Sequence, residues 1–287
     1  MADPAKIVST NASGNFFVDT TCINCDACRQ LAPATFVDAG EYSAVYQQPA
    51  TDIDVIAATR ALLCCPTGSI GTKEKNQAAI VRQEFPLLLD DNVYYCGFNS
   101  AKSYGANSFF VKHQGGNWLI DSPKFLPFLV EKFEQLGGIK YIFLTHRDDV
   151  ADAAKYAEKF TAVRIIHADE LYSQPESEIV FEGYEASEFA PEFTIIPVPG
   201  HTKGHMLLLY KNKFLFTGDH LSYEPETRGL YAFRNHCWYS WPEQTKSMEK
   251  LTHYDFEWVL AGHGDKVRLP FAEMKKQLKA LVERMKD

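Results

Sequence analysis

The chain has 287 residues, a formal net charge of −8 at pH 7 and a hydrophobic content of 46%. This length allows a full hydrophobic core and a second small domain, and no apolar run approaches the roughly 18 residues of a membrane-spanning helix. The acidic balance disfavours nucleic acid as a partner, because affinity for polyanions depends on Lys and Arg. The first residues lack the apolar stretch of a secretory signal. We therefore expect a cytoplasmic protein without a membrane partner, or the mature form of an organellar one.

Residues 1–15 are polar, and we expect a loosely held terminus there. Beyond them, three cysteines are separated by two residues in each gap, and a fourth precedes a proline: Cys22, Cys25, Cys28 and Cys65. Thiolates at this spacing suit iron-sulfur ligation, since a short loop reaches three corners of a cluster and a distant Cys-Pro supplies the fourth. The odd total of seven cysteines disfavours a disulfide framework. Structural zinc is the alternative, although it usually takes two well-separated cysteine pairs.

The sequence around these cysteines resembles the single-cluster ferredoxins of bacterial type over residues 16–73. The resemblance is carried by Cys22-Ile23-Asn24-Cys25-Asp26-Ala27-Cys28 and by Cys65-Pro66-Thr67-Gly68. It implies a small N-terminal α+β domain in which the four cysteines hold a 4Fe-4S cluster. Strands are expected near residues 16–18 and 42–46, and a helix near 53–63. The neighbouring Cys64 is expected to be a core residue.

Residues 74–92 are expected to connect this segment to a large α/β domain at residues 93–287. A helix should begin at Pro123 and end before Gly137, and a second should cover residues 150–160. Residues 222–242 are aromatic and aperiodic, so we expect a loop that shapes a site. The apolar spacing after residue 270 predicts a closing amphipathic helix. Strands are expected at residues 93–98, 107–112, 118–121, 163–166, 178–181, 193–198, 206–210, 213–216 and 257–260.

Four turns in the large domain place a histidine or an aspartate directly after an apolar β-like run. They carry His146, His201, Asp219 and His263. Rigid strands can fix the positions of metal ligands, while turns leave the ion open to substrate. The sequence therefore predicts a catalytic metal site at these strand ends.

The same turns resemble the metallo-β-lactamase superfamily, which includes glyoxalase-II-like hydrolases and flavo-diiron oxidoreductases. The matching residues are Gly200-His201-Thr202-Lys203-Gly204-His205, Thr217-Gly218-Asp219 and Gly262-His263-Gly264. The resemblance covers roughly residues 93–265. It implies an αββα sandwich with the metal at one edge.

The first motif of that superfamily, His-x-His-x-Asp-His, is altered in this chain. Its positions hold His146, Asp148, Val150 and Ala151, so two residues that would bind a second metal ion are missing. The resemblance then implies one zinc or iron ion on His146, His201 and Asp219, with Asp148 as a candidate fourth ligand. His263 stands where a ligand of the second metal belongs. Asp149 and Asp152 lie nearby at other offsets, and Asp148 or Asp149 could instead cap the following helix.

Three functions remain open for a chain with these motifs. A metal-dependent hydrolase would use Asp219 to orient the attacking water and His263 to assist proton transfer or stabilise an oxyanion. A non-haem iron oxidoreductase would use the cluster for electron transfer, with a redox partner protein. An inactive regulatory derivative is the third, because Val150 and Ala151 cannot bind metal. We expect a small-molecule substrate in either enzyme.

Overall fold

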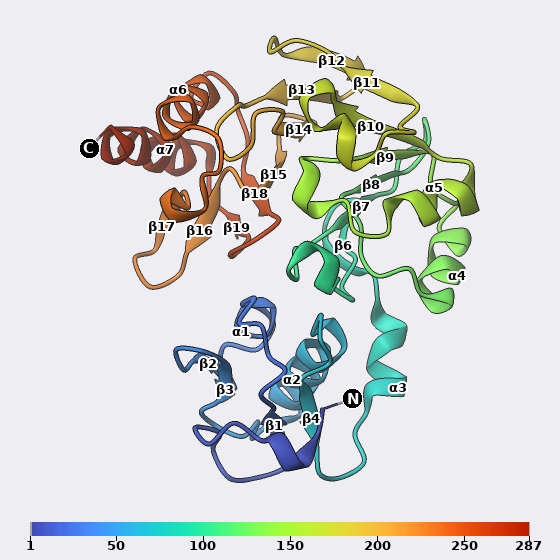
Figure 1. The fold of residues 1–287 in the computed structure, drawn as a ribbon, viewed down its shortest axis with the longest axis vertical. Helices are drawn as coiled ribbons and strands as arrows, with labels where there is room; N and C mark the ends of the chain where they lie inside the picture. Colours follow the sequence, from blue (N-terminus) through green and yellow to red (C-terminus); the bar gives the residue numbers. More distant parts are fainter. Residues whose placement is uncertain (1, 287) are drawn as a thin grey trace. The chain divides into compact units, whose positions relative to one another are not determined.

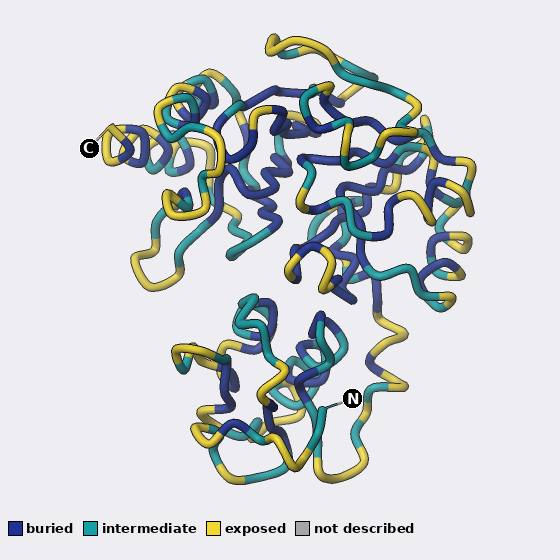
Figure 2. Tube along the Cα trace, viewed as in Figure 1, coloured by how far each residue is buried: buried dark blue, intermediate teal, exposed yellow. Residues whose placement is uncertain are grey.

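The structure is a computed structural model that describes residues 2–286. The chain divides into two compact units (Figure 1). The first unit contains the residues up to Asn117 together with Ser122–Gly138. The second contains Trp118–Asp121 and the residues from Ile139 onward. Each unit has a buried interior beneath exposed turns (Figure 2).

The N-terminal part of the first unit is a small α+β layer. Strand β1 (Phe16–Val18) pairs with β4 (Ile70–Thr72), and β2 (Phe36–Asp38) pairs with β3 (Ser43–Val45), both antiparallel. Helices α1 (Ala27–Leu31) and α2 (Asp52–Cys64) complete it. Helix α2 begins with a capping box between Thr51 and Asp54, which satisfies backbone donors at its N-terminus. These elements confirm the strands and the helix expected here, and Cys64 is fully buried as predicted.

The rest of the first unit contains α3 (Ala78–Val81), the antiparallel strands β5 (Leu87–Asp90), β6 (Val93–Tyr95) and β7 (Phe109–Val111), and α4 (Pro127–Gln135). Residues 74–92, expected to be a connector, thus include a short helix and a strand. Helix α4 begins at Pro127, so the expected start at Pro123 was wrong. Leu126 is extended, as the residue before a proline tends to be, and the helix can start only after it.

The second unit holds two sheets. Strands β8 (Trp118–Ile120), β9 (Tyr141–Phe143), β10 (Val163–His167) and β11 (Ile179–Phe181) pair in that order, all parallel. The other sheet has the order β12-β13-β14-β15-β18-β19. Its strands are β12 (Ser187–Ala190), β13 (Phe193–Pro197), β14 (Met206–Tyr210), β15 (Phe214–Gly218), β18 (Trp258–Ala261) and β19 (Val267–Arg268).

The two sheets meet through aromatic side chains, and helices cover their outer faces. The rings of Trp118 on β8 and Phe193 on β13 stack with centroids 4.3 Å apart. Helix α5 (Ala153–Phe160) packs beside β10. Helices α6 (Trp241–Leu251) and α7 (Phe271–Met285) share a buried cluster with β14, β15 and β18. The expected αββα layering is therefore confirmed.

Residues 222–242, predicted to form a loop, contain more structure than expected. Strands β16 (Ser222–Glu224) and β17 (Gly229–Tyr231) form a hairpin, and α6 begins at Trp241. Three-residue strands are too short to show an alternating pattern, so this prediction was wrong in that part. Among residues 2–286, none of the helices combines the length and the apolar character needed to cross a bilayer.

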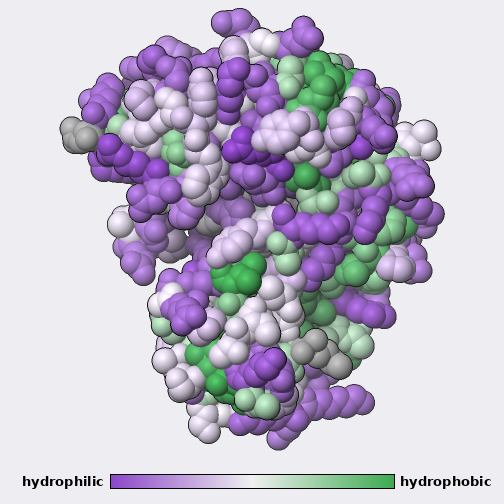
Figure 3. All heavy atoms as spheres, viewed as in Figure 1, coloured by the Kyte–Doolittle hydropathy of each residue, from purple (hydrophilic) through white to green (hydrophobic). Residues whose placement is uncertain are grey.

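The face of the molecule drawn in Figure 3 is mostly hydrophilic, and its apolar atoms form separate patches. Scattered apolar residues of this kind are normal on protein surfaces. The molecule's apolar side chains are instead concentrated in the buried clusters described above.

Candidate functional site

The second unit gathers the predicted metal-binding residues at the ends of its strands. His146 follows β9, and His201 lies on the turn between β13 and β14. Asp219 follows β15 and His263 follows β18, two strands that pair in parallel. The Gly262 N–H donates to Gly218 O at 2.8 Å, so the last two turns are held together by their backbones.

Gly218 allows these turns to approach closely. Its φ is +46°, and a Cβ atom there would lie 2.7 Å from the Thr145 hydroxyl and 2.8 Å from His205 Nε2. A side chain at this position would therefore be strained and would push the His146 turn away. This explains why glycine precedes Asp219.

Four donor atoms from three turns lie close together. Asp219 Oδ2 lies 3.7 Å from both His146 Nε2 and His201 Nε2. Asp148 Oδ2 lies 3.8 Å from His146 Nε2 and 3.7 Å from His201 Nε2. These are the four nitrogen–oxygen distances of the set, and the ligand atoms of His146, Asp148 and His201 all lie within 4.8 Å of one another. A regular tetrahedron with edges of 3.7–3.8 Å would have its centre about 2.3 Å from each corner, close to the roughly 2.0–2.2 Å of metal bonds to imidazole and carboxylate. The residues therefore fit a single metal ion.

The His146 ring is oriented by a buried chain of hydrogen bonds. Asp121 accepts from the Thr145 N–H at 2.9 Å and from the Thr145 hydroxyl at 3.0 and 3.1 Å. The same hydroxyl lies 2.9 Å from His146 Nδ1. This contact leaves Nε2 to face the other donor atoms, as supporting partners of metal-binding histidines commonly do. The sequence reasoning missed these roles, although Asp121, like Asp219, directly follows an apolar strand.

His263 contacts Asp219 rather than joining the four donor atoms. Its Nδ1 lies 2.8 Å from Oδ1 and 2.9 Å from Oδ2 of Asp219, and the backbone N–H of His263 donates to Oδ1 at 3.1 Å. Burial would raise the pKa of Asp219, but His263, His146 and His201 hold this pKa well below its ordinary value. Asp219 is therefore ionised at neutral pH, and His263 Nδ1 must carry the proton that it donates.

Burial also keeps the imidazoles of His146 and His205 neutral. It lowers the pKa of His146 well below its ordinary value. The pKa of His205 is lowered to about 3, again mainly by burial. Neutral imidazole is the form that binds a metal. His205 Nε2 lies 3.2 Å from Thr217 O, and the His205 ring stacks on His146.

Asp149 is buried beside the four donor atoms. Neither of its oxygens has a hydrogen-bond partner within residues 2–286, and a ligand atom of Asp149 lies within 4.8 Å of ligand atoms of His146 and Asp219. Burial first, and then the Asp219 charge, raises the pKa of Asp149 well above its ordinary value. Asp152 is instead paired with Lys155 at 3.1 Å. Asp152 is also the N-cap residue of α5, so the alternative that Asp148 or Asp149 caps that helix was wrong.

The aromatic segment before α6 is attached to the His201 turn. The N–H groups of Trp238 and Tyr239 both donate to His201 O, at 2.9 and 3.1 Å. The Trp238 side chain is 57% exposed, and its ring lies 6.2 Å from the His201 ring. An exposed aromatic side chain therefore borders the predicted metal site.

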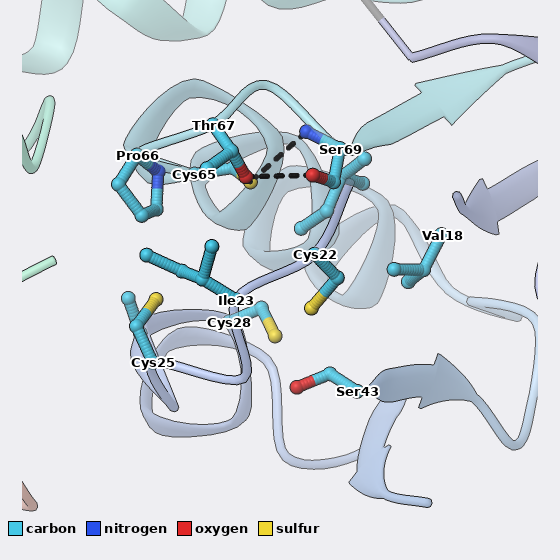
Figure 4. A pocket seen from close by; sticks show the side chains of 12 residues that line it. Val18, Cys22, Ile23, Cys25, Cys28, Ser43, Cys65, Pro66, Thr67 and Ser69 are labelled. Carbon is cyan, nitrogen blue, oxygen red and sulfur yellow. Dashed lines mark hydrogen bonds between the residues drawn. The ribbon is translucent and has the colours of Figure 1, made fainter. Parts of the chain in front are cut away.

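The first unit brings the four predicted cluster ligands to one pocket (Figure 4). Val18, Ile23 and Ile70 line the same pocket beside the sulfur atoms. All seven cysteines are free thiols. The loop reaches this arrangement because Asn24 and Asp26 adopt left-handed conformations, with φ of 54° and 72°.

Hydrogen-bond donors already face these sulfur atoms. The Asn24 N–H lies 3.4 Å from Cys22 Sγ and the Ser69 N–H lies 3.2 Å from Cys65 Sγ. Burial raises the pKa of the Cys25 and Cys28 thiols to about 12. Buried sulfurs with backbone donors suit an iron-sulfur cluster, whose charge such donors stabilise. The residues therefore fit a 4Fe-4S cluster.

Comparison with known families agrees with both sites. Residues 103–263, more than half of the chain, match the metallo-beta-lactamase superfamily. The chain belongs to this superfamily. Residues 18–72 match the 4Fe-4S single cluster domain of Ferredoxin I. The chain thus joins a ferredoxin domain, which indicates a 4Fe-4S cluster, to a metallo-β-lactamase domain, whose fold implies bound metal ions.

Solved structures show the same fold at low sequence identity. The DIM-1 metallo-beta-lactamase is 16% identical, with a TM-score of 0.53 over 69% of this chain and 95% of that one. A metallo-beta-lactamase from Hirschia baltica is 16% identical, with a TM-score of 0.53 over 68% of this chain and 96% of that one. FIM-1 from Pseudomonas aeruginosa, in its mono-zinc form, is 15% identical, with a TM-score of 0.52 over 69% of this chain and 93% of that one. At these identities the likeness concerns the fold alone.

Proposed function

We propose that this chain is a metal-dependent hydrolase of a small molecule, with one metal ion held by His146, Asp148, His201 and Asp219. The observation that carries the proposal is the set of two imidazole nitrogens and two carboxylate oxygens, in which each nitrogen lies 3.7–3.8 Å from each oxygen. Two imidazoles and two carboxylates suit zinc or ferrous iron. The mono-zinc form of FIM-1 supports a one-metal site on this fold.

Of the four proposed ligands, Asp148 is the one most exposed to solvent. The side chains of His146 and His201 are 0% and 3% exposed, whereas that of Asp148 is 44% exposed. Substrate would therefore approach across Asp148. Trp238, exposed beside His201, would contact its apolar part.

When bound, the metal ion would supply a Lewis acid and a water of lowered pKa. His263 and Asp219 would handle the proton in this hydrolysis. Because Nδ1 of His263 donates to Asp219, Nε2 is the nitrogen that can accept a proton whenever the ring is neutral. His263 Nε2 would take a proton from the attacking water, and the Asp219 carboxylate would stabilise the imidazolium formed. We therefore assign His263 to proton transfer and Asp219 to positioning both His263 and the metal.

A non-haem iron oxidoreductase is the second candidate. The ferredoxin domain favours it, because a 4Fe-4S cluster held by Cys22, Cys25, Cys28 and Cys65 can pass electrons and hydrolysis consumes none. Such an enzyme would bind ferrous iron at His146, Asp148, His201 and Asp219, the residues proposed above as metal ligands. It would receive electrons from a redox partner protein, with which it would share the cytoplasm.

One experiment separates the two functions. The anaerobically purified protein, with iron, zinc and sulfide quantified, is offered a panel of esters, thioesters, lactams and phosphoesters without oxygen or reductant. The hydrolase proposal expects turnover under these conditions and about one metal ion per chain beyond the cluster. Turnover that requires oxygen or electrons would favour the oxidoreductase. The variant His263→Gln should lower kcat while the metal content stays unchanged.

A further inference from the structure

The loop between β6 and β7 lies outside the ferredoxin match but contacts the cysteine loop. The match ends at residue 72, whereas this loop covers residues 96–108 of the same compact unit. The Tyr104 hydroxyl donates to Ile23 O, between two of the cluster cysteines. Asn107 Nδ2 donates to Gln30 Oε1 at 3.1 Å, on helix α1. Polar contacts thus fix this loop against the cluster site at two points.

Gly105 is the residue of this loop that comes closest to a cluster ligand. A Cβ atom at Gly105 would lie 2.7 Å from Cys25 Cβ, 2.8 Å from Cys25 Sγ and 3.1 Å from Pro66 Cγ. The residue also has a φ of +91°, which only glycine adopts without strain. The backbone of residue 105 therefore lies in direct contact with the Cys25 side chain, and no other amino acid fits there.

Lys124 approaches the fourth cysteine from a different segment. Its ammonium donates to Cys65 O at 3.2 Å, and the side chain is half-buried. Burial lowers the pKa of Lys124, and the charges of Cys65, Cys64 and Cys25 oppose this effect. A positive charge thus lies within electrostatic range of two of the predicted cluster ligands.

We infer that the 4Fe-4S site is composite: the β6–β7 loop closes it at Cys25 through Gly105, and the Lys124 ammonium raises the cluster's reduction potential. The inference rests on the cluster and not on the reaction at the other metal site. Reduction adds one negative charge to the cluster, and a nearby cation in a half-buried position stabilises that charge. The segment that matches a ferredoxin is therefore completed as a cluster site by Gly105 and Lys124.

The first test compares two glycines of nearly equal backbone conformation. Gly40 has a φ of +93°, but a Cβ atom there would meet no atom of the described residues within 4 Å. Gly105→Ala and Gly40→Ala therefore carry similar strain, and only the former collides with Cys25. We expect Gly105→Ala to lose most of its cluster iron and sulfide, while Gly40→Ala retains the wild-type content. Equal retention in both variants would overturn the closing role of the loop.

The second test measures the midpoint potential of the cluster by EPR-monitored redox titration of the full chain. Lys124→Met should lower the potential so that the ratio of reduced to oxidised cluster falls about tenfold, or about 59 mV for one electron. Lys124→Arg, which keeps the charge, should stay near the wild type. Lys132→Met is the control, because Lys132 also donates to a backbone carbonyl, Gln83 O at 3.1 Å, but on helix α4.

Two results would overturn the role of Lys124. One is an unchanged potential in Lys124→Met. The other is an equal shift in Lys132→Met, which would reveal a general charge effect. If Lys124→Met folds without a cluster, Lys124→Arg decides: cluster binding with a wild-type potential supports the role of the charge, and a shifted potential refutes it.

Discussion

The proposed cluster site and the proposed metal site of this chain differ in how the fold brings their ligands together. Three of the four cluster cysteines come from one loop of seven residues, whose path depends on left-handed conformations at Asn24 and Asp26. The four donor atoms of the metal site come from turns spread between residues 146 and 219, which two sheets bring together. Local backbone conformation therefore places three of the cluster cysteines, whereas the register of distant strands places the predicted metal ligands.

The largest effect is expected when the metal site, whose ligands are distributed over several turns, loses one ligand. His201→Ala removes a donor atom that lies 3.7 Å from each of two carboxylates. Even supporting partners of metal ligands are worth about 10- to 100-fold in affinity, so we expect metal affinity to fall by more than about 100-fold. Cluster iron should remain, because the cysteine loop is independent of this turn.

Metal titration with separate sulfide analysis measures both effects in His201→Ala. The exposed His253 provides the control variant, His253→Ala. Wild-type metal content in His201→Ala would contradict the assignment of His201 as a ligand.

The second prediction concerns the two adjacent aspartates after His146. Asp148→Asn should weaken metal binding by about 100-fold, because it removes an anionic ligand. Asp149→Asn should keep one metal ion per chain, because burial and Asp219 already favour the neutral form of Asp149. Equilibrium dialysis with metal analysis distinguishes the variants. A wild type with two ions, one of which is lost in Asp149→Asn, would make Asp149 a ligand of a second metal.

A smaller effect is expected one step away from the metal. Thr145→Val removes the hydroxyl that connects Asp121 to His146 Nδ1 but keeps the shape of the side chain. We expect metal affinity to fall about tenfold, at the lower end of such effects. Thr202→Val is the matched control, since the buried Thr202 hydroxyl has no hydrogen-bond partner in the described part of the chain. Equal affinities of the two variants would refute the orienting role.

The smallest effect lies in the scaffold of the distributed site. Burial would raise the pKa of Glu178, but the hydrogen bonds and charge of Arg164 hold it below its ordinary value of 4.5. The ionised form is thus favoured by folding, and this contribution is lost as pH falls through the lowered pKa. Glu178→Gln should cost about 1 kcal/mol or less at pH 7, since Glu178 is 42% exposed.

The difference between the wild type and Glu178→Gln should vanish as pH falls below 4.5. Urea unfolding at several pH values measures it, with the exposed Glu188→Gln as a control for the charge change. A difference that persists in acid would exclude the ion pair as its cause.

The contrast between the two sites also explains what the sequence could predict. The spacing of Cys22, Cys25 and Cys28 can be recognised directly in the sequence, because one short loop carries all three residues. The turns that carry His146, His201 and Asp219 could be found by their position after apolar strands. The burial of Asp149 could not, because it results from the short 3-10 turn at Arg147–Asp149. Nor could the contact between Gly105 and Cys25, which no sequence spacing encodes.

Fold elements were predicted with the same dependence on local signals. Long apolar strands and the closing helix α7 were found with small boundary errors. The hairpin β16–β17 was missed, because its pairing is the only thing that distinguishes it from a loop. The position of helix α4 followed Pro127 and not Pro123, since the extended Leu126 decides where the helix can begin.

The backbone hydrogen bond between Gly262 and Gly218 has a consequence for redesigning the surface beside the proposed metal site. It ties the Asp219 and His263 turns to each other through main-chain atoms. The backbone of residues 222–240 is itself held in place, since the Tyr223 N–H donates to Asp265 O and Leu230 is buried. The exposed side chains of Trp238 and Tyr239 could therefore be varied while this backbone frame keeps the turns in register.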